Sequence, residues 1–166
     1  METVTINKKA KLSEHFTLAE LCKTSVKTQD GNIPSRVHIE NLKRLCGWLE
    51  ELRRRNGTLH QPLPRGGGTE YEEKPIVINS GYRSPEVNRA VGGAPTSNHL
   101  TGCAVDIRVA GIEQLIRYAA ILLDISDERH EDFDELLLER SPKGTYWLHF
   151  AVRPSGNRRR VRLIQT

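Results

Sequence analysis

The chain has 166 residues, of which 37% are hydrophobic and 28% are charged, so we expect a single domain, 1–166, that is large enough to bury a core. No apolar run is long enough for a membrane span, and the first residues lack the apolar centre of a secretory signal peptide. The net charge of +4 invites a nucleic-acid hypothesis, but with only 5% aromatic residues we expect no nucleic-acid partner.

The N-terminal part predicts two helices. Thr17 and Glu20 form a capping box for a short helix that ends at about residue 23. The longest helix is expected over 36–55, where apolar residues recur with helical spacing on one face. Its last turn carries three successive arginines, which suit the helix dipole, and Asn56-Gly57 is a usual stop signal.

Residues 58–74 predict a long loop that contains Pro62, Pro64 and three successive glycines. A loop of this length inside a domain is usually functional or disordered. We expect a mobile insertion, with a substrate lid as the alternative.

The rest of the chain alternates strands and helices. Ser84 and Pro85 supply the N-cap and first-turn proline of a helix through about residue 91. A further helix is expected at 111–125, and strands are expected at 75–80, 102–109, 134–139, 146–153 and 160–164. The last strand is rich in arginine, which suits an exposed sheet edge. The predicted class is α+β, with an antiparallel sheet backed by helices.

A histidine and an aspartate lie seven residues apart, at His99 and Asp106. In the expected strand only Gly102 and Ala104 precede the carboxylate on its face, so there is little bulk in front of it. A turn before the strand can bring the imidazole over that face. Such a pair occurs often by chance, but it is also two thirds of a zinc site, which needs one more protein ligand and an open position.

The candidate for the third ligand is His149, which lies in an apolar, strand-like run after Trp147. Alternation places these two side chains on one face. A lone histidine in such a run is more often a hydrogen-bonded core residue than a ligand. Together with the pair at 99 and 106, however, it indicates a metal site.

The three cysteines, Cys22, Cys46 and Cys103, cannot all pair with one another, and we expect them to be reduced, buried small residues. Cys103 lies four residues after His99, but alternation places it on the side opposite Asp106. We therefore expect that it does not bind the metal.

The pattern Ser-x-His-x-x-Gly-x-Ala-x-Asp at 97–106, followed by Trp-x-His at 147–149, resembles the zinc D-alanyl-D-alanine metallopeptidases. Those share their zinc site and fold core with the sonic hedgehog signalling domain. The run Ser80-Gly81-Tyr82-Arg83-Ser84-Pro85 matches a second element of the family, and Phe16-Thr17-Leu18-Ala19-Glu20-Leu21 resembles the start of a small branch found in bacteria and their phages.

The resemblance implies one zinc ion, held by His99, Asp106 and His149, and hydrolysis of peptidoglycan peptides by attack of metal-activated water. The activity would be that of a D,D- or L,D-carboxypeptidase or an endopeptidase. Arg83 would hold a carboxylate or carbonyl of the substrate, and its alternative role is that of a surface arginine at a helix start. Ser97 would contact substrate termini, or it is a plain loop serine.

Trp147, on the face of the last ligand, completes the expected substrate contacts. The general base is harder to assign, because the relatives place an acidic residue three or about six positions before the last ligand, where this chain has Tyr146 and Lys143. We assign the base to Glu139, since a hairpin that sets it opposite Trp147 makes it a diagonal neighbour of His149. A register shifted by one residue would turn Glu139 away.

If Glu139 is only a solvated or ion-paired strand residue, Glu135 is the next candidate. The alternative to an enzyme is a non-catalytic zinc-containing module that binds cell-wall fragments or a protein partner. Because no signal peptide is visible, we expect the protein in the cytoplasm or delivered to the cell wall by a phage. The sequence leaves the oligomeric state open.

Overall fold

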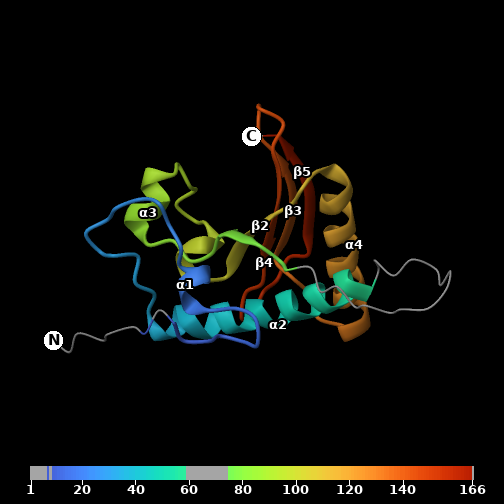
Figure 1. Ribbon diagram of the computed structural model, residues 1–166, viewed down its shortest axis with the longest axis horizontal. Helices are drawn as coiled ribbons and strands as arrows, with labels where there is room; N and C mark the ends of the chain where they lie inside the picture. Colours follow the sequence, from blue (N-terminus) through green and yellow to red (C-terminus); the bar gives the residue numbers. More distant parts are fainter. Residues whose placement is uncertain (1–6, 8, 59–74, 166) are drawn as a thin grey trace, which may run out of the picture.

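A computed structural model describes residues 7, 9–58 and 75–165 (Figure 1). The predicted loop at 58–74 lies outside these residues except for Thr58. The elements, in chain order, are α1 (Leu18–Leu21), α2 (Arg36–Thr58), β1 (Ile78–Ser80), α3 (Pro85–Ala90), the 3-10 helix η1 (Asn98–Thr101), β2 (Ala104–Arg108), α4 (Ile112–Arg129), β3 (Glu135–Arg140), β4 (Tyr146–Ala151) and β5 (Arg160–Gln165). The α+β class is confirmed. None of the described helices is long and apolar enough to cross a membrane.

The five strands form one sheet in the order β1-β2-β4-β3-β5. Neighbouring strands are antiparallel as predicted, except that β5 runs parallel to β3. The connection at 152–159 explains this exception, because it carries the chain from the end of β4 across β3 to the sheet edge. The new strand then runs opposite to β4, and therefore in the same direction as β3.

The register of the β3–β4 hairpin determines which side chains share a face of the sheet. Leu137 lies opposite His149 and Glu139 lies opposite Trp147, which is the predicted register. These residues, together with Asp106 opposite His149 on β2, lie on what we call the site face. The alternate residues, such as Leu136, Leu148 and Phe150, are fully buried on the other face.

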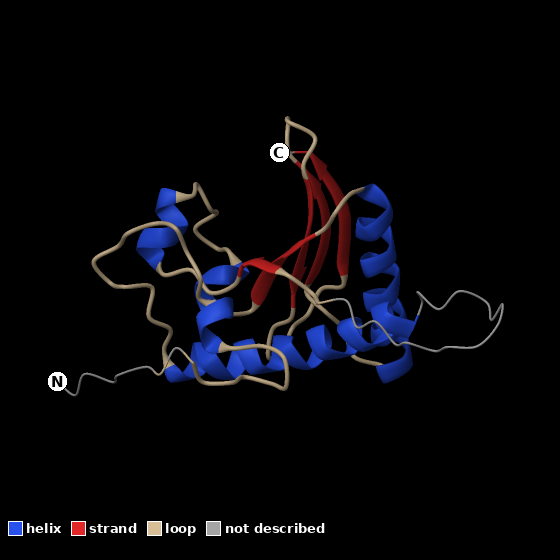
Figure 2. Cartoon of the chain, in the orientation of Figure 1, coloured by secondary structure: helices blue, strands red, loops and turns tan. Residues whose placement is uncertain are grey.

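The core lies between that other face and the helices α2 and α4. Leu49 of α2 and Leu122 of α4 are fully buried, and the Trp48 ring lies 5.3 Å from the Phe150 ring. Figures 1 and 2 show α4 along one side of the sheet, α2 beneath it, and α3 on the side away from α4. The two long helices therefore leave most of the site face to the loops around α3.

Both N-terminal capping predictions are confirmed. The Thr17 hydroxyl accepts the backbone N–H of Glu20 at 3.3 Å, and Ser84 accepts that of Val87 at 3.3 Å ahead of Pro85. These caps satisfy N–H groups that the first turn of a helix leaves free. They also define where the chain enters α1 and α3, the two short helices that flank the β1–α3 loop.

The predicted end of the longest helix is wrong, because α2 continues through Asn56-Gly57 to Thr58. Asn56 is fully buried, and Arg55 pairs with Glu128 of α4 at 2.5 Å. Packing of the last turn against α4 outweighs the local stop signal, whose cost in a helix is about 1 kcal/mol for the glycine. The end of α4 differs as well: it extends to Arg129 rather than residue 125.

Candidate metal centre

His99, Asp106 and His149 converge from η1, β2 and β4. One ligand atom from each residue lies within 4.8 Å of the other two. Direct pairing of Asp106 with His149 across β2 and β4 brings these two together, while η1 supplies the first histidine. The structure thus brings together the three residues that the motifs singled out.

The turn that carries His99 is short and capped at both ends. The Ser97 hydroxyl accepts the backbone N–H of His99 at 3.3 Å. Gly102 ends the turn with φ of 70°, and an added Cβ there would lie 2.7 Å from the backbone oxygen of His38. Gly102 is therefore a helix cap rather than the strand residue that alternation predicted. Ser97 positions the histidine, and its contact with substrate stays a prediction.

The carbonyl of Gly81 fixes the ring of His99. His99 Nδ1 lies 2.6 Å from this oxygen, and a carbonyl only accepts, so Nδ1 carries the hydrogen. The other nitrogen, Nε2, then presents its lone pair toward Asp106 Oδ1 at 3.2 Å. The approach requires glycine, because a Cβ at residue 81 would lie 2.2 Å from the backbone oxygen of Leu21.

His149 approaches Asp106 Oδ1 with its Nδ1 nitrogen, whereas His99 approaches the same oxygen with Nε2. Nδ1 of His149 lies 2.9 Å from Asp106 Oδ1. The histidine is buried, with 7% of its surface exposed. Nε2 of His99 and Nδ1 of His149 therefore both face Asp106 Oδ1. These three atoms are the candidate metal ligands.

The charges of the cluster depend on one another. Burial favours a neutral Asp106, but the two histidines beside it outweigh burial and hold the pKa of its carboxyl well below the usual range. Burial lowers the pKa of His99. For His149, the nearby carboxylates of Asp106 and Glu135 outweigh burial and raise the pKa to about 9. Without metal, a proton on His149 thus balances the buried carboxylate.

The donor set fits zinc. Catalytic zinc sites use three protein ligands drawn from imidazole nitrogens and carboxylate oxygens, and they leave a fourth position open. Here two imidazoles and one carboxylate meet at a partly buried point, and the ring hydrogen of His99 already lies on the nitrogen that faces away. The cluster could therefore hold a metal ion once the proton on His149 is displaced.

Arg83 lies against the outer oxygen of the same carboxylate. Its Nη2 donates to Asp106 Oδ2 at 2.5 Å, and its Nε donates to the Ser80 hydroxyl at 2.8 Å. The guanidinium is thus held at the edge of the candidate centre by β1 and β2. Its role toward a substrate stays a prediction.

Glu139 and Trp147 lie side by side on the site face and are partly exposed. Within the described residues, burial and nearby charges act on the Glu139 carboxylate, and no hydrogen bond contributes to its pKa. Burial raises its pKa, and the nearby His149 opposes this effect. The register predicted from the sequence is right, while the assignment of Glu139 as base and of Trp147 as a substrate contact stay predictions.

Cys103 does not contribute to the cluster in the described residues. It is buried, as is Cys46, whereas Cys22 is partly buried, and none of the three forms a disulfide within the described residues. Burial raises the pKa of the Cys103 thiol. A metal binds the thiolate rather than the thiol, so this environment disfavours Cys103 as a ligand.

Three residues contribute to the site in ways that the sequence did not predict: Asn32, Gly81 and Glu135. Asn32 is buried and bridges the loop after β1, donating to the Tyr82 oxygen at 3.3 Å and accepting the Ser84 N–H at 2.7 Å. Glu135 places Oε2 3.5 Å from His149 Nε2. Two of them had a signal in the sequence: Gly81 stands in the matched run at 80–85, and alternation places Glu135 on the site face, where it is the alternative to Glu139 as base.

Most arginines of the two runs at 53–55 and 158–160 pair with carboxylates of the described residues. Arg54 and Arg55 pair with Glu51, and Arg158 pairs with the fully buried Asp134 at 2.7 Å. Arg159 contacts Asp127 at 2.5 Å. Much of the basic charge in the two runs therefore stabilises the fold.

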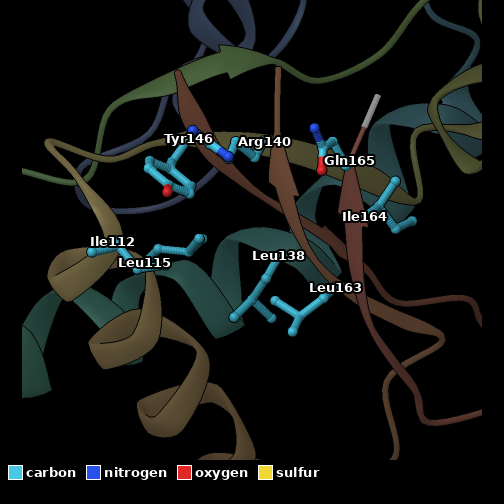
Figure 3. A pocket seen from close by; sticks show the side chains of 8 residues that line it. All are labelled: Ile112, Leu115, Leu138, Arg140, Tyr146, Leu163, Ile164 and Gln165. Carbon is cyan, nitrogen blue, oxygen red and sulfur yellow. The ribbon is translucent and has the colours of Figure 1, made fainter. Parts of the chain in front are cut away.

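A pocket lies on the α4 side of the sheet, away from the candidate metal centre (Figure 3). Its lining is mainly apolar and consists of Ile112, Leu115, Leu138, Arg140, Tyr146, Leu163, Ile164 and Gln165. Ile112 is 46% exposed at its rim, and Leu163 of the edge strand is 80% exposed. The pocket is lined by the start of α4 and by residues of β3, β4 and β5.

Residues 68–135 match the family model for Peptidase M15. The match covers about two fifths of the chain, includes Arg83, His99 and Asp106, and ends before β4. It confirms the resemblance to the zinc D-alanyl-D-alanine metallopeptidases. No curated protein matches the sequence.

Proposed function

We propose that this protein is a zinc-dependent peptidase acting on peptidoglycan peptides. The proposal proceeds from the match of residues 68–135 to the Peptidase M15 family model. The observation that carries the proposal is the convergence of His99, Asp106 and His149, whose ligand atoms lie within 4.8 Å of one another. His149 lies outside the matched segment, so its arrival at the site is an observation independent of the family match.

The three residues have complementary parts in holding the ion. A zinc ion bound there would supply Lewis-acid polarisation of the scissile carbonyl and of a water molecule. Asp106 contributes one negative charge, and the two histidines bind as neutral imidazoles. Arg83 keeps Oδ2 of Asp106 occupied, so that Oδ1 is the oxygen directed between the histidines.

Glu139 is proposed as the proton acceptor for the attacking water. It lies on the site face two residues along β3 from Leu137, the partner of His149, and it is partly exposed. Burial raises its pKa toward the working pH, which favours proton transfer by a general base. The Arg83 guanidinium is proposed to bind a carboxylate or carbonyl oxygen of the substrate, for which its planar fork of donors is suited.

The proposed substrate class rests on the family resemblance and on the roles proposed for Glu139 and Arg83. We propose cleavage by a D,D- or L,D-carboxypeptidase or an endopeptidase activity. An arginine that binds a terminal carboxylate favours a carboxypeptidase, and one that binds a backbone carbonyl favours an endopeptidase.

A second candidate is a zinc-containing module without catalysis. The observation that favours it is the absence of a carboxylate at the two positions where relatives place the base, which are Tyr146 and Lys143 in this chain. In that case the site face would bind a cell-wall fragment or a protein partner, and Glu139 would have no role in turnover.

The experiment that separates the two candidates is incubation of the zinc-loaded protein with defined muropeptides, read by mass spectrometry. The peptidase proposal predicts product masses that identify one cleaved bond, loss of products after chelation, and their return when zinc is added back. Intact muropeptides in the presence of bound zinc would favour the module and would contradict the peptidase.

A further inference from the structure

We propose that Glu135 is a positioning residue for the metal centre, which orients His149 through its outer ring nitrogen. The proposal rests on the proposed function, in that it takes the cluster of His99, Asp106 and His149 as a zinc site. It assigns Glu135 a task different from that of Glu139, although the two side chains leave the same strand on the same face.

The outer ring nitrogen of His149 is Nε2, which lies beside the carboxylate of Glu135. This nitrogen is buried, and no described residue accepts from it in good hydrogen-bond geometry. The carboxylate beside it is that of Glu135, with Oε2 at 3.5 Å. This distance is long for a hydrogen bond but short enough for strong attraction in a site where the Glu135 side chain is only 15% exposed.

Other groups hold the Glu135 carboxylate in place. Its Oε1 accepts from Arg158 at 3.0 Å and from Arg160 at 3.1 Å. Its Oε2 accepts from the Asn98 side chain at 3.1 Å. These three contacts hold both oxygens of the Glu135 carboxylate in place, so it is well suited to act as a fixed acceptor.

The two histidines are alike in having an acceptor beside the outer ring nitrogen. A histidine that binds a metal through one nitrogen usually donates from the other to a carboxylate or carbonyl, which fixes its tautomer and ring orientation. His99 does so from Nδ1 to Gly81. His149 meets Asp106 with Nδ1, so its remaining nitrogen is Nε2, and Glu135 is the matching acceptor.

The same carboxylate also connects the two ligand-bearing segments. Asn98, which precedes His99 on η1, donates to Glu135 and also to the buried Asp134 at 2.8 Å. The start of β3 is thereby tied both to η1 and to β4. Loss of the Glu135 carboxylate would release His149 directly and would weaken the hold on the turn of His99.

The test compares zinc affinity in the full chain for the wild type, Glu135→Gln, Glu135→Ala and Glu139→Gln, measured by competition with a chelator of known affinity. The removal of an outer partner of a metal-bound histidine typically weakens metal binding by about 10–100-fold. We expect a loss of that size in Glu135→Ala and a smaller one in Glu135→Gln, whose amide oxygen still accepts. Glu139→Gln, the matched control on the same strand, should stay within about 3-fold of wild type.

A second readout separates positioning from general structural support. In the zinc-loaded protein labelled with nitrogen-15, the ring resonances of His149 should show Nε2 protonated, and this signal should shift in Glu135→Gln while that of His99 Nδ1 is retained. A folded Glu135→Gln protein with wild-type zinc affinity and unchanged His149 resonances would overturn the inference. A wild type that binds no zinc would overturn the proposed function and this inference with it.

Discussion

Replacement of Glu139 by glutamine removes the proposed proton acceptor without changing the size of the side chain. Glu139 lies opposite Trp147, so it is a diagonal neighbour of His149, with about 7–8 Å between the two backbones. A glutamate side chain in that position reaches the space beside the metal centre, where a glutamine would have similar reach but could not take a proton.

The expected magnitude follows from this placement. A positioned general base typically contributes about 10²–10⁴-fold to the rate, which corresponds to about 3–5 kcal/mol of activation free energy. Stability should not fall, because burial raises the pKa of Glu139, so that the ionised side chain is less favourable in the folded chain than in the unfolded one. The Glu139→Gln protein should therefore keep its zinc and its melting temperature but lose turnover.

The assay is the initial rate of release of product peptides from a defined muropeptide, with zinc content and melting temperature measured on the same preparations. A kcat within about 3-fold of wild type would refute the assignment of Glu139. A loss of rate accompanied by a loss of zinc would refute the reasoning as well, because the residue would then act through the metal site rather than as a base.

Four further predictions concern other parts of the chain. Arg83→Ala should lower kcat/KM by a factor that corresponds to a loss of about 2–5 kcal/mol of transition-state binding. Unchanged kinetics would mean that Arg83 has only a structural role. Leu122→Ala, in the fully buried core, should lower the free energy of unfolding measured in urea by about 2–5 kcal/mol; a loss below 1 kcal/mol would contradict that packing. Arg158, Asn98 and other partners outweigh burial and lower the pKa of Asp134, so its stabilising effect is present above the unfolded pKa of about 3.9 and is lost as the pH falls through the folded value. Asp134→Asn should therefore flatten the acid limb of a stability-versus-pH curve, and parallel curves would be the contrary result. Cys103→Ser should leave zinc content unchanged, whereas loss of the ion would make the thiol a ligand.

The site face could be anticipated because alternation in strands is a strict rule. The positions of Leu137 and Glu139 relative to His149 follow from one hairpin register, and the structure has that register. Arg83, His99 and Asp106 could be singled out because they stand in motifs with defined spacing. Alternation therefore predicts which side chains of one strand share a face of the sheet.

The parts that could not be anticipated depend on contacts between distant segments. α2 continues past Asn56-Gly57 because its end packs on α4, a contact with no trace in the local sequence. The close approach of Gly81 to Leu21, and the buried bridge made by Asn32, likewise join segments far apart in the chain. The parallel edge strand depends on how the 152–159 connection crosses the sheet.

The most direct test of the central claim is the zinc content of the purified chain, measured by elemental analysis after dialysis against a weak chelator. We expect one zinc per chain in the wild type and none or nearly none in His149→Ala and Asp106→Ala, with both variants still folded by circular dichroism. Zinc retained equally in the wild type and in folded His149→Ala would contradict the assignment of the metal centre.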